Sequence, residues 1–492
     1  MYILKNKDSI RPILLLSLLF MFCGHAFCYA NLSFSGASVM VDASKSNASL
    51  VADGQFLATL YWRVRGSLSA PMIVGILSVL YLTASAVLIA DMLRITHPLS
   101  LLALCGTLSL HVGVTAINAS MLHMADTYFL AFLFAVLSAW LCHQHRLGYI
   151  AGIFYLAAVP GIESSMLAAA PALLLITFLL NVLDGEAVSD HLAMLIKSLM
   201  GGVVGFALYY VAAFLFCHQQ SAELCSTFQF IQPPLDMYLR PIRQLFAPTT
   251  SYAALCAFLS GFLMALSVLA LLIHLITIKL SGKVALIICV ILLPFVLGMP
   301  VFDPEPNLAV NQSFVFSLLP VAMITVLDRL FDTLAACKAK RLRILTTAAF
   351  GITFLSSIVF SNQIYLKKNL EYQTTLSVMT RVIEMAEQTD GFDPNSSTVA
   401  IVGCIENSPI AMAHKGFEHL AVLDAAANNY TASSQEENTW YFWEIMGYPF
   451  NFVTDFERDQ LAATAAVKSM PVFPNQGCCQ MLGQTLVIRL SE

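Results

Sequence analysis

The chain has 492 residues, of which 58% are hydrophobic and only 11% are charged. A soluble domain carries about 25% charged residues, so most of this chain cannot face water, and we predict a polytopic membrane protein. The formal net charge of −5 leaves no basic surface for a nucleic acid. The composition therefore favours lipid and a neutral or phosphorylated substrate as partners.

Eleven apolar stretches are candidates to cross a hydrocarbon layer of about 30 Å. In chain order they are residues 12–30, 71–93, 98–117, 127–142, 147–159, 165–183, 198–217, 252–278, 284–300, 309–327 and 344–361. The fifth is short and stops at Pro160-Gly161, so it is either a half-helix or a tilted partner of the sixth. We predict an all-α bundle with about eleven transmembrane helices.

The basic residues of the short loops predict the orientation, because Lys and Arg are retained on the cytoplasmic side. They precede the first span and then recur in alternate loops, at Lys5, Lys7, Arg11, Arg94, Arg146, Lys197, Lys279, Lys283, Lys338, Lys340, Arg341 and Arg343. The N-terminus is therefore expected in the cytoplasm, and an odd number of spans places the loop at 31–70 and everything after about residue 362 outside. If the first span is a signal peptide cleaved near residues 28–30, the loop at 31–70 still lies outside.

The chain changes character after residue 361. Charged residues from Lys367 to Glu387 interrupt an apolar helical pattern, which predicts an amphipathic helix on the outer leaflet. The β-type runs 398–403 and 484–489 then predict a small α/β domain. The expected domains are thus residues 1–361 and 362–492. The second has no phosphate-binding glycine motif and is expected to be a structural cap. The adjacent Cys478 and Cys479 do not have zinc-ligand spacing, so we expect no metal.

Carboxylates in the outer loops are candidates for a general base, which a sugar hydroxyl needs when it attacks an anomeric carbon. The outer-loop carboxylates include Glu163, between the fifth and sixth spans, and Asp303 with Glu305, before the tenth. The main candidates are Asp42 and Asp53 in the first loop and Asp126 at the start of the fourth span. Each has a structural alternative: Asp126 is equally suited to a first-turn acid that favours the helix dipole, and Asp42 and Asp53 to solvated loop positions. Gly54 favours Asp53, because a glycine allows close backbone approach.

Arginines in outer loops run against the positive-inside trend and suggest a phosphate partner. Arg63 and Arg65 precede the second span, and Arg240 and Arg243 lie in a proline-rich outer loop. The alternative is that they anchor the chain to anionic lipid headgroups. Glu163, between the fifth and sixth spans, joins these arginines as a candidate substrate-binding residue.

Four segments in chain order resemble conserved segments of a known family. They are Asp53–Ser78, which resembles "GRF…RG…APW…GLLS", Met124–Ala131, which resembles "ADAYMLA", Asn362–Lys368, which resembles "NQxYLK", and Met470–Gly477, which resembles "PVYPxxG". The family is that of bacterial polytopic glucosyltransferases related to the O-antigen enzymes of serotype-converting phages. The resemblance extends over nearly the whole chain.

This resemblance implies a type-C glycosyltransferase of the bacterial cytoplasmic membrane, with its active site on the outer face. Such enzymes take a hexose, here glucose, from a polyprenyl-phosphate donor and place it on a surface glycan or lipid-linked acceptor, with no cofactor. The protein partners that the resemblance leaves open are a synthase that makes the donor and a flippase that moves it across the membrane. The family's acidic positions correspond to Asp53 and Asp126. The chain departs from the family pattern at Asn31 and Gln55, so either Asp42 supplies the acid or activity is altered or lost.

The resulting hypothesis assigns a role to each residue. Asp42 or Asp53 deprotonates the acceptor hydroxyl, Asp126 orients the donor sugar, and Arg63 and Arg65 or Arg240 and Arg243 stabilise the leaving phosphate. Two alternatives remain: a transporter or flippase for lipid-linked sugars, and a catalytically inactive scaffold of glycan assembly.

Overall fold

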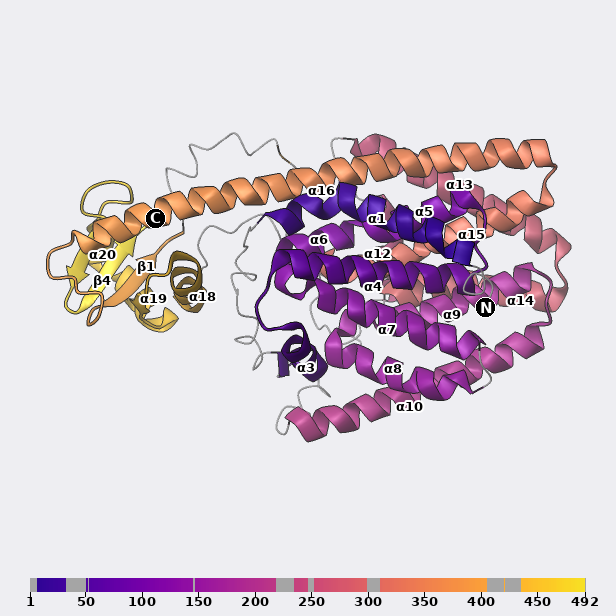
Figure 1. The fold of residues 1–492 in the computed structure, drawn as a ribbon, viewed down its shortest axis with the longest axis horizontal. Helices are drawn as coiled ribbons and strands as arrows, with labels where there is room; N and C mark the ends of the chain where they lie inside the picture. Colours follow the sequence, from indigo (N-terminus) through magenta and orange to yellow (C-terminus); the bar gives the residue numbers. More distant parts are fainter. Residues whose placement is uncertain are drawn as a thin grey trace.

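The computed structural model describes residues 7–31, 50–51, 53–144, 147–217, 234–246, 252–298, 310–404, 420 and 435–491. These residues form a helical bundle and a small domain beyond one end of it (Figure 1). We call the end of the bundle nearest the small domain the domain end, and the opposite end the far end. Asp42, Asp303 and Glu305 lie outside the described residues.

The bundle consists of long apolar helices. They are α1 (Lys7–Ala30), α4 (Pro71–Met92), α5 (Pro98–Leu110), α6 (Val112–Ser120), α7 (Ala125–Gln144), α8 (Gly148–Ile162), α9 (Ala169–Leu183), α10 (Val188–Cys217), α13 (Ala253–Thr277), α14 (Leu280–Gly298), α15 (Leu318–Thr333) and α16 (Ala336–Glu387). Within the described residues, ten spans are long and apolar enough to cross a membrane, with α5 and α6 forming one span broken at His111. The predicted multi-pass helical membrane protein is thereby confirmed at this level.

The fifth predicted span is α8, which is shorter than the ten spans. It continues through Pro160 to Ile162, instead of ending at residue 159. A proline this close to the C-terminus still fits, because the helix needs few further backbone hydrogen bonds there. The helix packs between α7 and α10, so it belongs to the bundle as a helix separate from α9.

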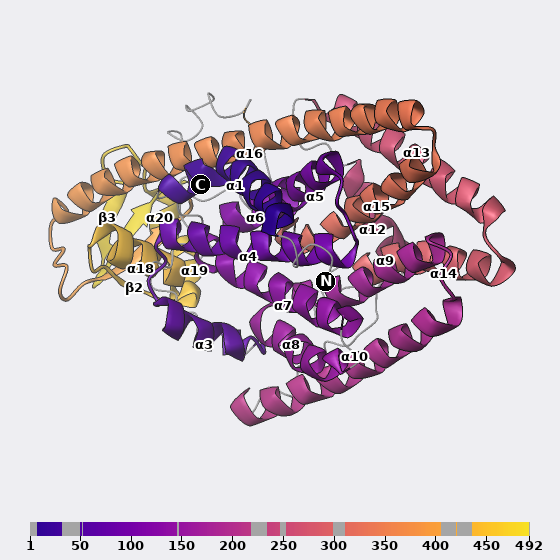
Figure 2. The same ribbon diagram turned by 45° about the vertical axis from the view of Figure 1, so that its right-hand side comes forward.

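The last membrane helix is longer than the sequence suggests. α16 runs without a break over 52 residues, a length of about 78 Å at 1.5 Å per residue. It lies along one flank of the bundle and continues past the domain end in both views (Figures 1 and 2). The segment after residue 361, expected as an amphipathic helix of its own, is therefore the second half of α16. Its apolar residues Val378, Met379 and Val382 are buried against the sheet of the small domain.

Small residues allow the helices to approach one another closely. A Cβ at Gly75 in α4 would overlap the ring of Tyr29 in α1, and a Cβ at Gly106 in α5 would overlap the ring of Phe354 in α16. Such small-residue contacts are the usual way for membrane helices to gain packing energy, because burial from lipid supplies little. They fix α1 and α16 against the centre of the bundle.

Ion pairs tie the helix ends together at the far end. Arg329 Nη2 donates to Asp184 Oδ2 at 3.1 Å, and Arg94 Nη1 lies 3.5 Å from the same oxygen. Arg343 Nη2 lies 2.6 Å from Asp332. Asp91 is buried near this end and accepts a hydrogen bond of 2.9 Å from Trp140 Nε1. Asp91 therefore faces the bundle interior, where a buried carboxylate in a membrane helix is expected to find polar partners.

The small domain contains a four-stranded sheet with the order β2-β1-β4-β3. Its elements are β1 (Thr398–Val402), α18 (Gln435–Trp440), the π-helical turn η9 (Tyr441–Met446), β2 (Asn451–Phe452), α19 (Asp455–Ala463), α20 (Ala465–Ser469), β3 (Cys479–Leu482) and β4 (Thr485–Arg489). β1 pairs parallel with β2 and β4, and β3 pairs antiparallel with β4. α16 covers one face, and Val467 and Met470 pack on the other. The small α/β domain is thus confirmed.

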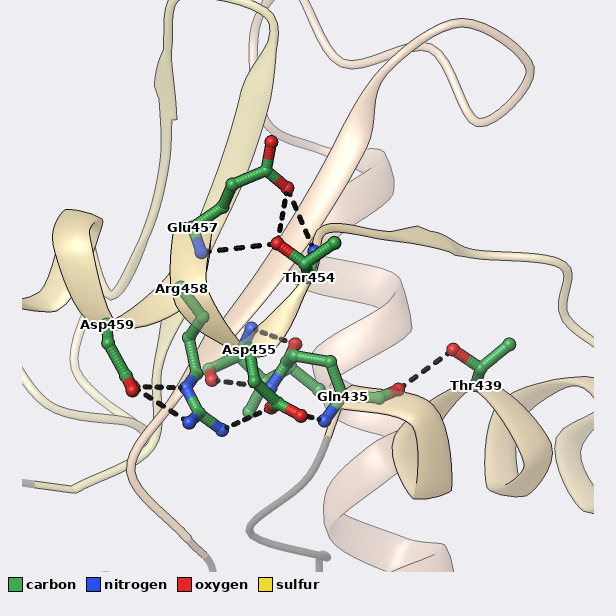
Figure 3. A network of polar contacts seen from close by, with 8 residues as sticks. Gln435, Thr439, Thr454, Asp455, Glu457, Arg458 and Asp459 are labelled. Carbon is green, nitrogen blue, oxygen red and sulfur yellow. Dashed lines mark hydrogen bonds and ion pairs between the residues drawn. The ribbon is translucent and has the colours of Figure 1, made fainter. Parts of the chain in front are cut away.

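A polar network completes the short edge of this sheet (Figure 3). β2 pairs with only the first two residues of β1, which leaves Ile401 without a strand partner on that side. The Gln435 side chain donates to Ile401 O at 3.1 Å and accepts from Ile401 N at 3.2 Å. Asp455 accepts the Gln435 backbone N–H at 2.9 Å and pairs with Arg458 at 3.0 Å. Gln435 therefore takes the place of the missing strand residue.

Candidate functional site

The short helix α3 (Phe56–Arg65) lies at the domain end of the bundle and has two different faces (Figure 1). Ala58 and Trp62 are buried, and the helical spacing places Arg65 on the same side. Leu60 and Val64 are exposed, as expected for a helix that lies in a membrane interface. Arg63 is exposed on that outer side. Arg63 and Arg65, which are two residues apart in the sequence, therefore lie on opposite faces of α3.

Arg65 forms a buried ion pair with Asp126, the second residue of α7. Arg65 Nη1 lies 2.6 Å from Asp126 Oδ1, and the two side chains are 2% and 0% exposed. The same nitrogen donates to His123 O at 3.1 Å. The Trp62 ring lies beside the guanidinium, with 5.8 Å from Cζ to the ring centroid, and donates its own N–H to Thr127 Oγ1 at 3.0 Å. We call these residues, with Tyr61, the Arg65–Asp126 cluster.

Most of the hydrogen-bond donors and acceptors of the cluster are paired with one another, but not all of them. Asp126 Oδ1 also accepts from Thr127 N at 3.1 Å, and Oδ2 accepts from the Tyr61 hydroxyl at 2.7 Å. A carboxylate has about four lone-pair positions, so Oδ2 retains one acceptor position. Arg65 Nη2 is buried and has no hydrogen-bond partner within the described part of the chain. The cluster thus offers one donor and one acceptor position to a substrate.

Tyr61 is held as a hydrogen-bond donor in this cluster. Burial, and then the negative charge of Asp126, raise the pKa of the Tyr61 hydroxyl well above its ordinary value. The Tyr81 hydroxyl lies 3.2 Å from it. A tyrosine with a raised pKa keeps its proton at neutral pH, so Tyr61 fixes the orientation of Oδ2.

A second polar group lies at the start of α3. Gln55 Nε2 donates to the buried Glu163 at 3.4 Å, and Glu163 also accepts from Ser165 Oγ at 2.8 Å. Gly54, with φ of 79°, presents its carbonyl to the Tyr209 hydroxyl at 3.2 Å. Asp53 is exposed beside this group, and partial burial raises the pKa of its carboxyl. No hydrogen bond to the Asp53 carboxylate occurs within the described residues.

The two groups are separated by the length of α3. Asp53 precedes the helix and Arg65 is its last residue, so the ten helical residues between them span about 15 Å. The structure brings Arg65 and Asp126 together, and it brings Glu163 near the loop that carries Asp53. It does not bring Asp53 and Arg65 to one reacting centre.

The other predicted arginines lie elsewhere. Arg240 and Arg243 belong to α12 (Pro234–Leu245), which packs against α14 and the turn η5 (Val310–Ser317). Arg243 makes an exposed ion pair with Asp236 at 3.4 Å. α12 does not pack extensively against α3 or α7 in the described structure. Arg63 makes no polar contact among the described residues, and its position suits the headgroup anchoring that the sequence left open.

A cavity of about 140 Å³ lies between α5, α12, α13, α15 and α16. Its polar lining includes His111, Gln244 and Thr353. None of the predicted catalytic or phosphate-binding residues lines it. The described residues contain no cluster of His, Cys, Asp and Glu that could hold a metal ion.

The sequence reasoning missed several residues of these groups. Tyr61 and Trp62 fall within the first family-like segment but carry no signal of their own. Lys368 lies in the segment expected to form an amphipathic helix on the outer leaflet, yet it is buried. Its helical spacing from the buried Ser361, Ile364 and Tyr365 could have placed it on the same inner face.

Comparison with known protein families, with curated proteins and with solved structures gives no significant match to this chain.

Proposed function

We propose that the protein is a membrane glycosyltransferase of type C that moves a hexose, glucose by the resemblance, from a polyprenyl-phosphate donor to a surface glycan or a lipid-linked acceptor. The observation that carries the proposal is the buried ion pair of 2.6 Å between Arg65 and Asp126. These residues come from two different family-like segments that are 61 positions apart. Contact between them supports treating the segments as parts of one site.

The reaction requires a base and an anion-stabilising donor close together. The acceptor hydroxyl oxygen attacks the anomeric carbon, the bond from that carbon to the phosphate oxygen breaks, and the hydroxyl proton passes to a carboxylate. Polyprenyl phosphate leaves with the bonding electron pair. Arg65 Nη2 is the unpartnered donor for the phosphate oxygens, and Asp126 Oδ2 has an acceptor position for a substrate hydroxyl.

The carboxylates of the preceding loop receive separate roles in this proposal. Because Asp53 lies about 15 Å from Arg65 along α3, it is better placed to bind hydroxyls of the acceptor than to reach the anomeric carbon. The raised pKa of the Asp53 carboxyl also suits a proton acceptor. The Asp53→Asn variant below measures how much Asp53 contributes to the transfer rate. Asp42 is the rival base from the same loop.

The test is transfer of labelled hexose from polyprenyl-phosphate-hexose in proteoliposomes. We expect Arg65→Gln to lower kcat about 100-fold, because losing a donor to a developing anion costs roughly 10²–10³ in rate. Tyr61→Phe keeps the ion pair and is expected to have a smaller effect. Arg63→Gln, on the other face of α3, is the matched comparison and should lose far less than Arg65→Gln.

The remaining variants locate the base. Asp53→Asn and Asp42→Asn are compared with Asp459→Asn, a change at an exposed residue of the small domain. If both loop variants are as fast as the parent, neither loop carboxylate is the base and that assignment fails. If Arg65→Gln also transfers at the parental rate, the site assignment is wrong.

The proposed membrane is the bacterial cytoplasmic membrane, with the N-terminus in the cytoplasm and the small domain outside. The basic residues Arg94, Arg329 and Arg343 gather at the far end, which agrees with retention of positive charge in the cytoplasm. Protease access to the small domain in intact spheroplasts tests this orientation.

A further inference from the structure

A group of buried polar side chains lies where the domain ends of α1 and α6 meet the middle part of α16. The Tyr29 hydroxyl donates to Asn118 Oδ1 at 3.1 Å, and Cys28 Sγ donates to the Asn118 backbone carbonyl at 3.5 Å. On the adjoining turn of α16, the Tyr365 hydroxyl lies 2.7 Å from His25 Nδ1. All of these side chains are buried.

Lys368 of α16 brings a cation into this group. Its residue is only 3% exposed. Lys368 lies one helical turn beyond Tyr365 on the same side of α16. Because Tyr365 contacts His25, one turn before Cys28 of α1, Lys368 lies beside the end of α1. Glu371 forms an ion pair of 3.8 Å with the neighbouring Lys367. Among the described residues, the Lys368 ammonium has neither an ion pair within 4 Å nor a hydrogen bond. A buried lysine is costly in a membrane protein and marks a functional position by default.

Asn118 supplies a second donor. Its Oδ1 is taken by Tyr29, whereas Nδ2 is buried and makes no well-aligned hydrogen bond in the described structure, with the Tyr365 hydroxyl as a polar neighbour. A buried amide donor without a bonded acceptor is unfavourable in a folded protein. Cys28 donates to the Asn118 backbone carbonyl and lies on the turn of α1 that faces Lys368, so Asn118 and Lys368 both lie against the end of α1.

This place adjoins the Arg65–Asp126 cluster. Asn118 lies in α6, which leads directly into the turn η3 (Leu122–Met124). The His123 carbonyl of this turn accepts from Arg65, and Tyr29 bonds directly to Asn118. The polar groups therefore continue from α7 through α1 and α6 to α16. They include three donors that make no well-aligned hydrogen bond among the described residues: Arg65 Nη2, Asn118 Nδ2 and Lys368 Nζ.

We propose that Lys368 and Asn118 form an oxyanion-binding site for a phosphate group. A phosphate has several strong acceptor oxygens, and a buried ammonium beside an amide N–H satisfies them at charge-assisted strength. The inference rests on the proposed function in one respect: the phosphate of the lipid donor is the oxyanion that would lie there beside Arg65. A free phosphate has the same chemistry, and the experiment separates the two sources.

The full-length protein in detergent micelles is titrated with farnesyl phosphate, with farnesol and with inorganic phosphate, and the thermal unfolding midpoint is followed. A ligand that binds only the folded state raises this midpoint with concentration. We expect farnesyl phosphate to stabilise the parent, and Lys368→Met to raise its apparent Kd at least tenfold. Lys368→Arg keeps the charge and should retain part of the affinity. Lys367→Met is the matched control on the same turn and should bind as the parent does.

Asn118→Asp is the second variant and covers the case in which Lys368→Met does not fold. It preserves the acceptor for Tyr29 but replaces the amide donor with a negative charge, so it should also raise the Kd at least tenfold. Equal binding of inorganic phosphate by the parent assigns the site to free phosphate. Equal binding of farnesol, or parental affinity in both Lys368→Met and Asn118→Asp, overturns the proposal.

Glycosyl transfer is measured in parallel, so that the two proposals fail separately. If farnesyl phosphate binding depends on Lys368 but no hexose is transferred, the oxyanion site stands and the proposed function is wrong. If transfer occurs and Lys368→Met has the parental KM for the donor, the proposed function stands and the oxyanion site is wrong.

Discussion

Replacing Asp126 by asparagine removes one charge from a buried ion pair and leaves the other in place. Arg65 Nη1 lies 2.6 Å from Asp126 Oδ1, and the side chains are 2% and 0% exposed. Removing one member of such a pair costs about 3–5 kcal/mol, because the remaining charge stays buried without compensation. Two unit charges about 4 Å apart attract each other by about 4 kcal/mol at an effective dielectric constant of 20, which agrees. We therefore expect Asp126→Asn to lower the free energy of unfolding by about 4 kcal/mol.

The assay is unfolding in mixed detergent and SDS micelles, followed by tryptophan fluorescence, for which Trp62 beside Arg65 is a local probe. The double variant Arg65→Met with Asp126→Leu removes both charges and should be more stable than either single variant. Asp236→Asn is the matched control, since its pair with Arg243 is exposed at 3.4 Å and should contribute at most about 1 kcal/mol. A loss below about 1 kcal/mol for Asp126→Asn would refute the reasoning, which rests on removal of one buried charge.

Three further predictions concern packing, the sheet edge and pH. Gly106→Val should separate α5 from α16, because its side chain would overlap Phe354; a thermal unfolding midpoint equal to that of the parent would contradict this. Gln435→Ala should leave both polar groups of Ile401 unsatisfied, at about 1–3 kcal/mol for each, and hydrogen exchange at the Ile401 amide should accelerate. Hydrogen bonds from Thr454 lower the pKa of Glu457, so the stability that it contributes is present above its unfolded pKa of about 4.3 and is lost as the pH falls through the lower folded value. Exchange in the first turn of α19, corrected for intrinsic rates, should show this loss, and Glu457→Gln should abolish it.

The membrane architecture was predictable because apolar length alone identifies spanning helices. The chain places its apolar runs where the ten spans and α8 lie. The continuity of α16 was not predictable, because charged residues after 361 look the same whether a helix ends at the interface or continues to another domain. Burial of Val378 and Val382 against the sheet supplies the reason for the continuity, and that contact is a tertiary one.

The candidate site was predictable in its residues but not in its grouping. Asp126 and Arg65 were both named from their place in outer loops, yet nothing in one sequence shows that residues 61 apart form an ion pair. Arg63 and Arg65 look equivalent in the sequence, and only the buried face of α3 distinguishes them. Lys368 was missed because a lysine beside a span is usually an interfacial anchor, whereas packing against α1 encloses this one.

The most direct measurement of the central claim is the fate of the sugar–phosphate bond in proteoliposomes that contain only this protein, a labelled polyprenyl-phosphate-hexose and an acceptor glycan. The proposal predicts that labelled hexose appears on the acceptor with an equal amount of polyprenyl phosphate, and that Arg65→Gln reduces both products together. Movement of the intact donor across the bilayer without cleavage would contradict it and favour a transporter. If the donor is neither cleaved nor moved, the result would favour a catalytically inactive scaffold.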